Sequence, residues 1–269
     1  MKKIIIPTDF SENAQKAIDY ALLLFKDEAC KFYILHAYHD VPSGEGSKMS
    51  FREDLYQLVK KLKSQPRKVE HQFEAILETD SVYNLTKQIQ IKENADYIFV
   101  GTKGLSAFRD VFIGSNTLRL IKDIKKCPVI SVPPAYVCSE LEGIIFATDF
   151  KYSFKPDELS PLIEMAVRSN ATLNVAHIKT EDTLCDNQKS NKEKLRKALS
   201  GVKHYFYEIQ QQDSVANTLI QIKKVNKQMG MLAILKTNHG FFKTLTRENV
   251  VKNIAYKTEI PLMVLQQMK

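Results

Sequence analysis

The residues best suited to chemistry form a glycine-containing run, GTKGLSAFRDVFIGSN, at residues 101–116. Gly101, Gly104 and Gly114 are followed by Ser115, directly before a helical pattern. Gly101 and Gly104 allow the backbone to turn tightly and to approach a ligand without an intervening Cβ. Gly114 and Ser115 would present amides and a hydroxyl at a helix N-terminus, which favours an anion. The run predicts a phosphate-binding loop. The competing interpretation is an ordinary loop with capping glycines and Ser115 as the helix N-cap.

Other polar residues have a structural and a functional interpretation. Asp9 follows a predicted strand, where it either caps a helix or contacts a ligand. His36 and His177 end apolar strands, and we expect them to be buried structural groups rather than catalysts. Lys103 and Arg109 either reach phosphates or are solvated charges. No catalytic motif is present, and the four cysteines lack metal-binding spacing, so neither catalytic residues nor a metal site are predicted.

Composition favours an ordinary globular protein. The chain has 269 residues, 44% hydrophobic and 26% charged, and no apolar run approaches the roughly 20 residues of a membrane span. No signal-peptide pattern is present, so a cytoplasmic location without membrane contact is expected. The net charge of +8 could suggest nucleic acid, but the lysines are interspersed with acidic residues. We therefore expect no nucleic-acid partner.

The sequence repeats itself with an offset that drifts from 140 to 133 residues. The matched segments are KKIIIPTDFS (2–11) with EGIIFATDFK (142–151), FYILHAY (32–38) with TLNVAHIK (172–179), TDSVYNLTKQI (79–89) with QDSVANTLIQI (212–222), and CPVISVP (127–133) with IPLMVLQ (260–266). The order is the same in both copies, which indicates a duplication. It predicts two domains, 1–138 and 139–269, joined through a linker at 133–143.

Each copy alternates short apolar strands with helical patterns, which predicts an α/β fold with parallel strands covered on both faces. In the first copy we expect strands at 4–7, 32–38, 71–77, 96–100 and 128–132, and helices at 12–26, 50–66, 81–93 and 115–125. In such sheets ligands bind beyond the carboxyl ends of the strands. The glycine run and Asp9 both lie at such ends.

The sequence resembles the universal stress protein family in its tandem two-domain form. The resemblance rests on IPTDFS at 6–11, LHA at 35–37 and the glycine spacing. It implies two tandem doubly wound five-stranded parallel sheets of strand order 3-2-1-4-5, with ATP at the carboxyl edge of the first and Mg²⁺ as an option on its phosphates. The nucleotide-binding residues that it implies are Pro7, Asp9, Ala37, Val100, Gly101, Gly104, Gly114, Ser115 and Asn116. Among these, Ala37 and Val100 would line the base pocket, and Asp9 would lie by the adenine or ribose.

The second copy departs from this pattern in its loop. Lys236 stands in the place of Gly101, and Glu248 and Asn249 stand near the places of Gly114 and Ser115. A glutamate repels a phosphate, and side chains replace bare backbone. We therefore predict a degenerate second domain without a comparable ATP site.

The sequence favours a cytoplasmic ATP-binding protein with a regulatory or stress-response role. Because no general base is evident, at most weak ATPase activity is expected. The alternative is a stress-response scaffold or interaction module that binds no nucleotide, and the loop would also accept another adenine-containing ligand. The duplication predicts an internal pseudo-dimer through the last strands of both copies, and a further homodimer is left open.

Overall fold

The chain forms two compact units. The structure, a computed structural model, describes residues 1–38, 48–102, 114–179, 183–210, 217–218, 228–237 and 258–268. The units are Met1–Pro134 and Ala135–Lys269, so the division falls inside the predicted linker at 133–143. The predicted domains place the boundary at 138 rather than 134.

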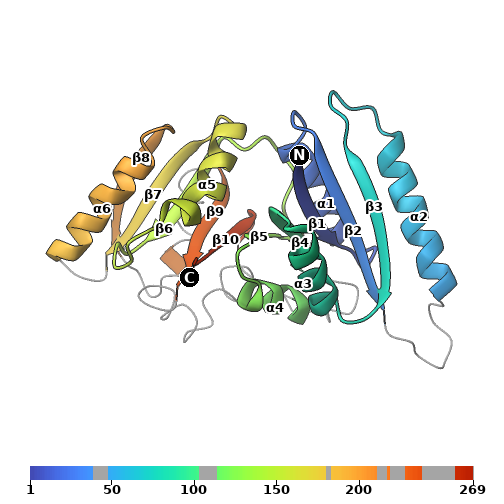
Figure 1. The fold of residues 1–269 in the computed structure, drawn as a ribbon. Coiled ribbons are helices and arrows are strands. Elements are labelled where there is room, and N and C mark those ends of the chain that lie inside the picture. Colours follow the sequence, from blue (N-terminus) through green and yellow to red (C-terminus); the bar gives the residue numbers. More distant parts are fainter. Residues whose placement is uncertain are drawn as a thin grey trace. The chain divides into compact units, whose positions relative to one another are not determined.

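The first unit is a five-stranded parallel sheet with four described helices (Figure 1). The strands are β1 (Lys2–Pro7), β2 (Cys30–Tyr38), β3 (Gln72–Thr79), β4 (Tyr97–Gly101) and β5 (Val129–Val132), and the helices are α1 (Glu12–Leu24), α2 (Lys48–Ser64), α3 (Val82–Glu93) and α4 (Ser115–Asp123). The strand order is β3-β2-β1-β4-β5, and every neighbouring pair is parallel. The predicted fold class, with order 3-2-1-4-5, is confirmed in this unit.

The second unit repeats this topology. Its strands are β6 (Gly143–Thr148), β7 (Thr172–Lys179), β8 (His204–Gln210), β9 (Met229–Lys236) and β10 (Leu262–Gln266), and its described helices are α5 (Pro156–Arg168) and α6 (Asp186–Ala198). All four neighbouring pairs are parallel, in the order β8-β7-β6-β9-β10. This is the same 3-2-1-4-5 order, so the duplication seen in the sequence is a duplication of the fold.

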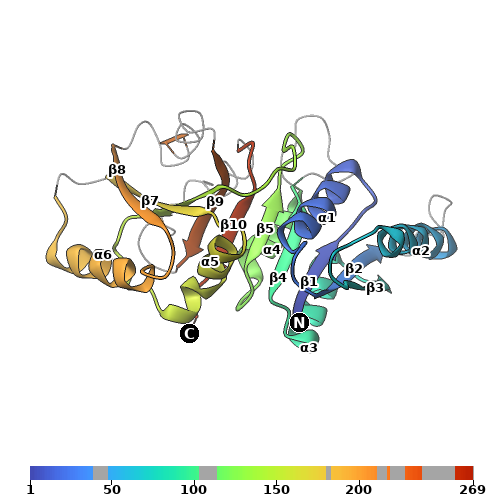
Figure 2. The same ribbon diagram turned by 90° about the horizontal axis from the view of Figure 1, so that it is seen from above.

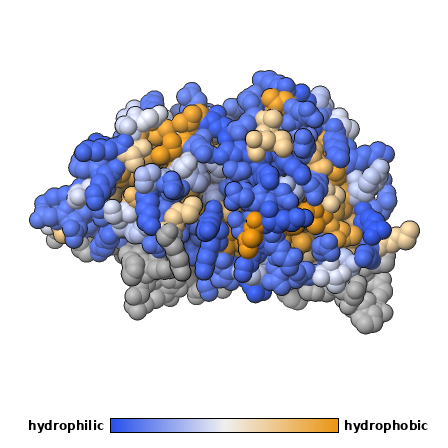
Figure 3. Space-filling view, viewed as in Figure 1, coloured by the Kyte–Doolittle hydropathy of each residue, from blue (hydrophilic) through white to orange (hydrophobic). Residues whose placement is uncertain are grey.

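Helices cover both faces of the first sheet (Figure 2). Successive side chains of a strand point to opposite faces, so each strand packs against helices on both. On β2, the ring of His36 lies 4.7 Å from that of Phe51 in α2, whereas Tyr33 points the other way and donates to Glu93 of α3 at 2.6 Å. A strand covered on both faces must be apolar throughout, and residues 4–6 of β1, all isoleucine, are fully buried. The described surface seen in Figure 3 is mainly hydrophilic with separate apolar areas.

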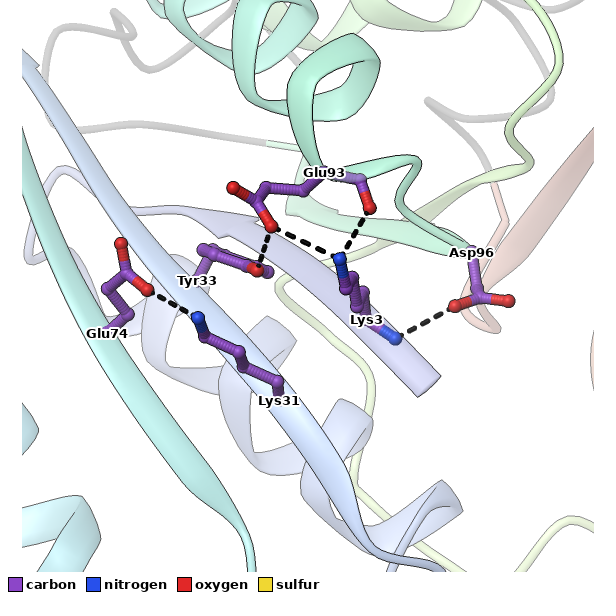
Figure 4. A network of polar contacts seen from close by, with 6 residues as sticks. All are labelled: Lys3, Lys31, Tyr33, Glu74, Glu93 and Asp96. Atoms are coloured by element: carbon purple, nitrogen blue, oxygen red, sulfur yellow. Dashed lines mark hydrogen bonds and ion pairs between the residues drawn. The ribbon is translucent and has the colours of Figure 1, made fainter. Parts of the chain in front are cut away.

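A polar network ties α3 to the amino-terminal edge of the first sheet (Figure 4). The Lys3 ammonium donates to the Glu93 carboxylate at 3.2 Å and to the Glu93 backbone carbonyl at 2.9 Å, and the Lys3 N–H donates to Asp96 at 2.8 Å. The hydrogen bond from Tyr33, followed by that from Lys3, lowers the pKa of Glu93. The network therefore anchors the last turn of α3 at the end of the sheet opposite to the predicted site.

Candidate nucleotide site at the carboxyl edge of the first sheet

The described site residues from the strands lie together at one edge of the first sheet. Pro7 ends β1, Ala37 is the penultimate residue of β2, and Val100 is the penultimate residue of β4. Pro7 pairs with Leu35, and Ile5 pairs with Ile98. With side chains alternating, this register places Pro7, Ala37 and Val100 on the same face, the one that carries α3. Gly104, Lys103 and Arg109 lie outside the described residues.

Asp9 lies in the turn that starts α1. Its Oδ1 accepts hydrogen bonds from the Ser11 N–H at 3.1 Å and the Ser11 hydroxyl at 2.6 Å. The Ser11 oxygen is the N-cap of α1 and accepts from the Ala14 N–H at 3.2 Å. Between them, Phe10 has a φ of 63°, and its N–H donates to the Thr8 hydroxyl at 3.0 Å. Asp9 thus supports the helix cap, as one of its two interpretations required, and its contact with a ligand stays a prediction.

His36 is buried and held by its neighbours. Its Nδ1 lies 2.8 Å from the carbonyl oxygen of Thr8, so this nitrogen carries a proton and donates. The ring packs between Phe10 and Phe51, with centroid distances of 4.6 and 4.7 Å. Its Nε2 has no hydrogen-bond partner among the described residues. The expectation of a buried histidine is met.

The second unit repeats the ring packing but not the hydrogen bond, because Nδ1 of His177 has no hydrogen-bond partner among the described residues. His177 is buried, and its ring stacks on Phe150 at 4.7 Å. Burial lowers the pKa of His177, so the ring is neutral at physiological pH. Phe150 has a φ of 56°, as Phe10 has one of 63°. A phenylalanine in the left-handed region is uncommon. Sequence reasoning overlooked both phenylalanines, although their recurrence in the two copies was a visible signal.

The close packing of α1 leaves no room for a side chain at Gly101. A Cβ at this position would stand 2.9 Å from the carbonyl oxygen of Asn13. Asn13 also donates through Nδ2 to the carbonyl of Val132 at 3.0 Å, and Thr117 donates to the carbonyl of Gly101 at 2.8 Å. The sequence suggested that Gly101 lets the backbone approach a ligand. The structure gives a packing reason, the close approach of the first turn of α1, and the approach of a ligand stays a prediction.

The N-terminus of α4 is the feature of this edge best suited to bind an anion. The helix begins at Ser115 with Gly114 as N-cap, and Gly114 offers no side chain to cap it. Ser115 and Asn116 are exposed. By contrast, the N-cap serines of α1 and α3 each accept a first-turn N–H. The competing interpretation of Ser115 as the N-cap is therefore wrong, because Gly114, whose N–H donates to the Thr102 carbonyl at 2.7 Å, holds that position.

Thr102 is a further polar residue of this edge that sequence reasoning overlooked. Its side chain is 1% exposed, and its hydroxyl has no hydrogen-bond partner among the described residues. A buried hydroxyl without a partner costs about 1–3 kcal/mol.

No group of three or more His, Cys, Asp or Glu in the described parts of the chain could hold a metal ion. In those parts, too, none of the helices has the length and apolar character to cross a membrane.

The corresponding edge of the second unit is built differently. Seven residues, 149–155, join β6 to α5, whereas four, 8–11, join β1 to α1. From α6, Gln188 donates to the carbonyl of Asp149 and Asn191 donates to that of Phe150, each at 2.9 Å. Lys236, the counterpart of Gly101, ends β9. The rest of the predicted degenerate loop, including Glu248 and Asn249, lies outside the described residues.

The fold and this edge define a tandem doubly wound α/β protein. The model of the universal stress protein family matches residues 1–133, so the first unit belongs to that family, and the second unit repeats its strand order. The resemblance noted in the sequence is thereby confirmed.

Similar proteins cover either about half of the chain or nearly all of it. A universal stress protein of Thermus aquaticus, described as lying in the QAH/OAS sulfhydrylase 3' region, is 28% identical over an alignment of 141 residues. The alignment covers 49% of this chain and 98% of the relative. The structure of a universal stress protein from Archaeoglobus fulgidus superposes with a TM-score of 0.70 at 15% identity, over 98% of this chain and 96% of that one. A functionally unknown protein from Pseudomonas aeruginosa gives 0.64 at 13% identity, over 99% and 92%. At such identities the two structures establish the fold alone.

Proposed function

We propose that the first unit binds an adenine nucleotide, ATP with Mg²⁺ on its phosphates, and that the chain is a cytoplasmic regulatory protein of the stress response. The observation that carries the proposal is the start of α4. Its N-cap residue, Gly114, offers no side chain to the first-turn amides, and Ser115 and Asn116 are exposed. Membership of the universal stress protein family supports the same assignment.

The residues of this edge fit the parts of a nucleotide. The amides of Ser115 and Asn116 would hold the phosphates, while Pro7, Ala37 and Val100 offer an apolar face to the base. A hydrogen bond to a charged group contributes about 1.5–3 kcal/mol, and immobilising the ligand costs several kcal/mol in return. Several such bonds give an expected affinity in the micromolar range. Because no general base is evident, the nucleotide would act as a bound signal, with at most weak hydrolysis.

Two substitutions of Gly114 test the site. Among the described residues, the nearest atoms to a Cβ here are the Thr102 carbonyl oxygen at 3.7 Å and the Thr117 hydroxyl oxygen at 4.0 Å, so these leave room for a side chain. Asp and Asn are both good N-caps, so Gly114→Asp and Gly114→Asn should keep or raise the stability of the unit. Gly114→Asp places a carboxylate where the phosphates would lie and should abolish ATP binding. Gly114→Asn, its neutral match, should weaken binding less.

Calorimetric titration with ATP–Mg²⁺ measures both variants, and thermal melting checks their folding. A folded Gly114→Asp protein that binds ATP as tightly as the unmodified chain would refute the assignment. Equal losses in both variants would show that occupancy of the N-cap, rather than charge, decides binding.

The second candidate function is a scaffold or interaction module that uses no nucleotide. It is favoured by Asp9, whose Oδ1 already supports the α1 cap. Mass spectrometry of small molecules released from the purified, denatured protein separates the two. Released adenine nucleotide supports the first candidate, and its identity would distinguish ATP from another adenine-containing ligand. An empty protein whose melting is unaltered by ATP–Mg²⁺ supports the second. The internal pseudo-dimer and a homodimer stay predictions from the sequence.

A further inference from the structure

The outer strand of the second sheet is β8. Within the described part of the chain, β8 pairs only with β7 (Figure 2). Tyr205 and Tyr207 are 49% and 47% exposed, with ring centroids 6.4 Å apart. The strand, HYFYEIQ, contains no proline or lysine, the residues that commonly block pairing at a sheet edge.

Alternate residues of β8 turn their backbone groups away from β7. The Leu173 N–H donates to the Lys203 carbonyl at 2.9 Å, and Leu173 lies opposite His204. In a parallel ladder this register directs the N–H and C=O of odd-numbered β8 residues toward β7. Those of Phe206 and Glu208 therefore point outward, where an added strand would meet them.

The two faces beside this edge differ in chemistry. Tyr205 and Tyr207 share one face. On the other, the guanidinium of Arg196 in α6 lies 4.6 Å from the ring centroid of Phe206, and the ammonium of Lys192 lies 3.4 Å from the Glu208 carboxylate. The sequence of α6, DNQKSNKEKLRKA, holds five basic residues and two acidic ones. One face is therefore aromatic and the other cationic.

The corresponding edge of the first unit also lies beside a basic helix, because α2 holds five basic residues and two acidic ones, as α6 does. On β3, the exposed residues include Glu74 and Glu78. Glu74 is paired with Lys31 at 2.7 Å (Figure 4). The two edges therefore differ in the strand itself, with two exposed glutamates on β3 and one, Glu208, on β8, and not in the charge of the helix beside them.

We propose that the β8 edge binds an extended acidic peptide segment of a partner protein as an added strand. Because side chains of a strand alternate, the segment would point acidic side chains toward α6 and apolar ones toward Tyr205 and Tyr207. Charge complementarity favours this occupant over a second copy of the chain, since antiparallel pairing of two β8 strands would bring two cationic α6 helices together. The inference is independent of nucleotide binding by the first unit.

The probe is a fluorescent nine-residue peptide of alternating Glu and Val, titrated against the full chain by anisotropy. A Lys/Val peptide of the same pattern and a peptide with all Glu before all Val are the controls. The alternating Glu/Val peptide should bind most tightly, and its affinity should fall with added salt. Equal binding of the Lys/Val peptide would overturn the proposal.

Two substitutions at one position separate strand addition from simple charge attraction. Glu208→Ala removes the carboxylate beside Lys192 and keeps the outward N–H, so the acidic peptide should bind more tightly. Glu208→Pro removes the same charge and also the N–H, and binding should be about tenfold weaker than in Glu208→Ala. Equal affinities of the two variants would refute strand addition.

Circular dichroism checks that Glu208→Pro is folded. If it is not, Arg196→Glu decides the matter, because it should weaken the Glu/Val peptide and strengthen the Lys/Val peptide, and an unchanged preference rejects the proposal. Sedimentation equilibrium tests the other occupant. If the unmodified chain is a dimer that the Glu208→Pro substitution dissociates, and if no peptide binds, the edge belongs to a second copy of the chain.

Discussion

Replacing Gly101 with alanine tests the packing of α1 against the candidate site. The new Cβ would stand 2.9 Å from the carbonyl oxygen of Asn13, and 3.0 Å from both its carbonyl carbon and its Oδ1. The first two are backbone atoms, which cannot rotate away, so α1 itself must shift. Such overpacking costs about 1–3 kcal/mol. The shift would also strain the hydrogen bond from Asn13 to Val132.

Amide hydrogen exchange read by mass spectrometry localises this effect, because it reports each unit separately. Peptides from residues 1–38 should exchange about 5- to 150-fold faster in Gly101→Ala, the factor that corresponds to about 1–3 kcal/mol. Peptides from the second unit should be unchanged. Gly114→Ala is the matched control. Its Cβ meets no atom of the described residues closer than 3.7 Å, so it should cost at most about 1 kcal/mol, through the poorer N-cap. Unchanged protection in Gly101→Ala would refute the packing argument.

Three further outcomes are expected. The Glu93 pKa lies below its ordinary value of 4.5, so its stabilising contribution is full above about pH 5 and is lost as pH falls through the folded pKa. Urea unfolding should therefore show a smaller acid loss in Tyr33→Phe, and an identical loss would contradict the network. Burial raises the pKa of Cys30 to about 12, so a thiol reagent at about pH 8 should modify exposed Cys185 first, and native labelling of Cys30 would count against its burial. Asn191→Ala should destabilise the second unit by about 1–3 kcal/mol, because a buried carbonyl loses its donor, and exchange there should accelerate.

Several features of this protein were determined by the sequence alone. Strand and helix periodicity placed every described element of the first unit within a few residues, and the repeat of TDF at 8–10 and 148–150 marked the duplication. These features depend on neighbouring residues, whose spacing a sequence displays directly. The family resemblance supplied the strand order, and the register of β1, β2 and β4 then brought Pro7, Ala37 and Val100 to one face.

Only the tertiary structure decided what Gly101 and Gly114 do. Asn13 and Val132 lie 119 positions apart, and their hydrogen bond sets α1 against Gly101. No local pattern marks that contact, since helix and sheet meet only after the strands have taken their register. The sequence left open whether Gly114 or Ser115 caps α4, because both residues are accepted N-caps. The structure decides for Gly114 by starting the helix at Ser115.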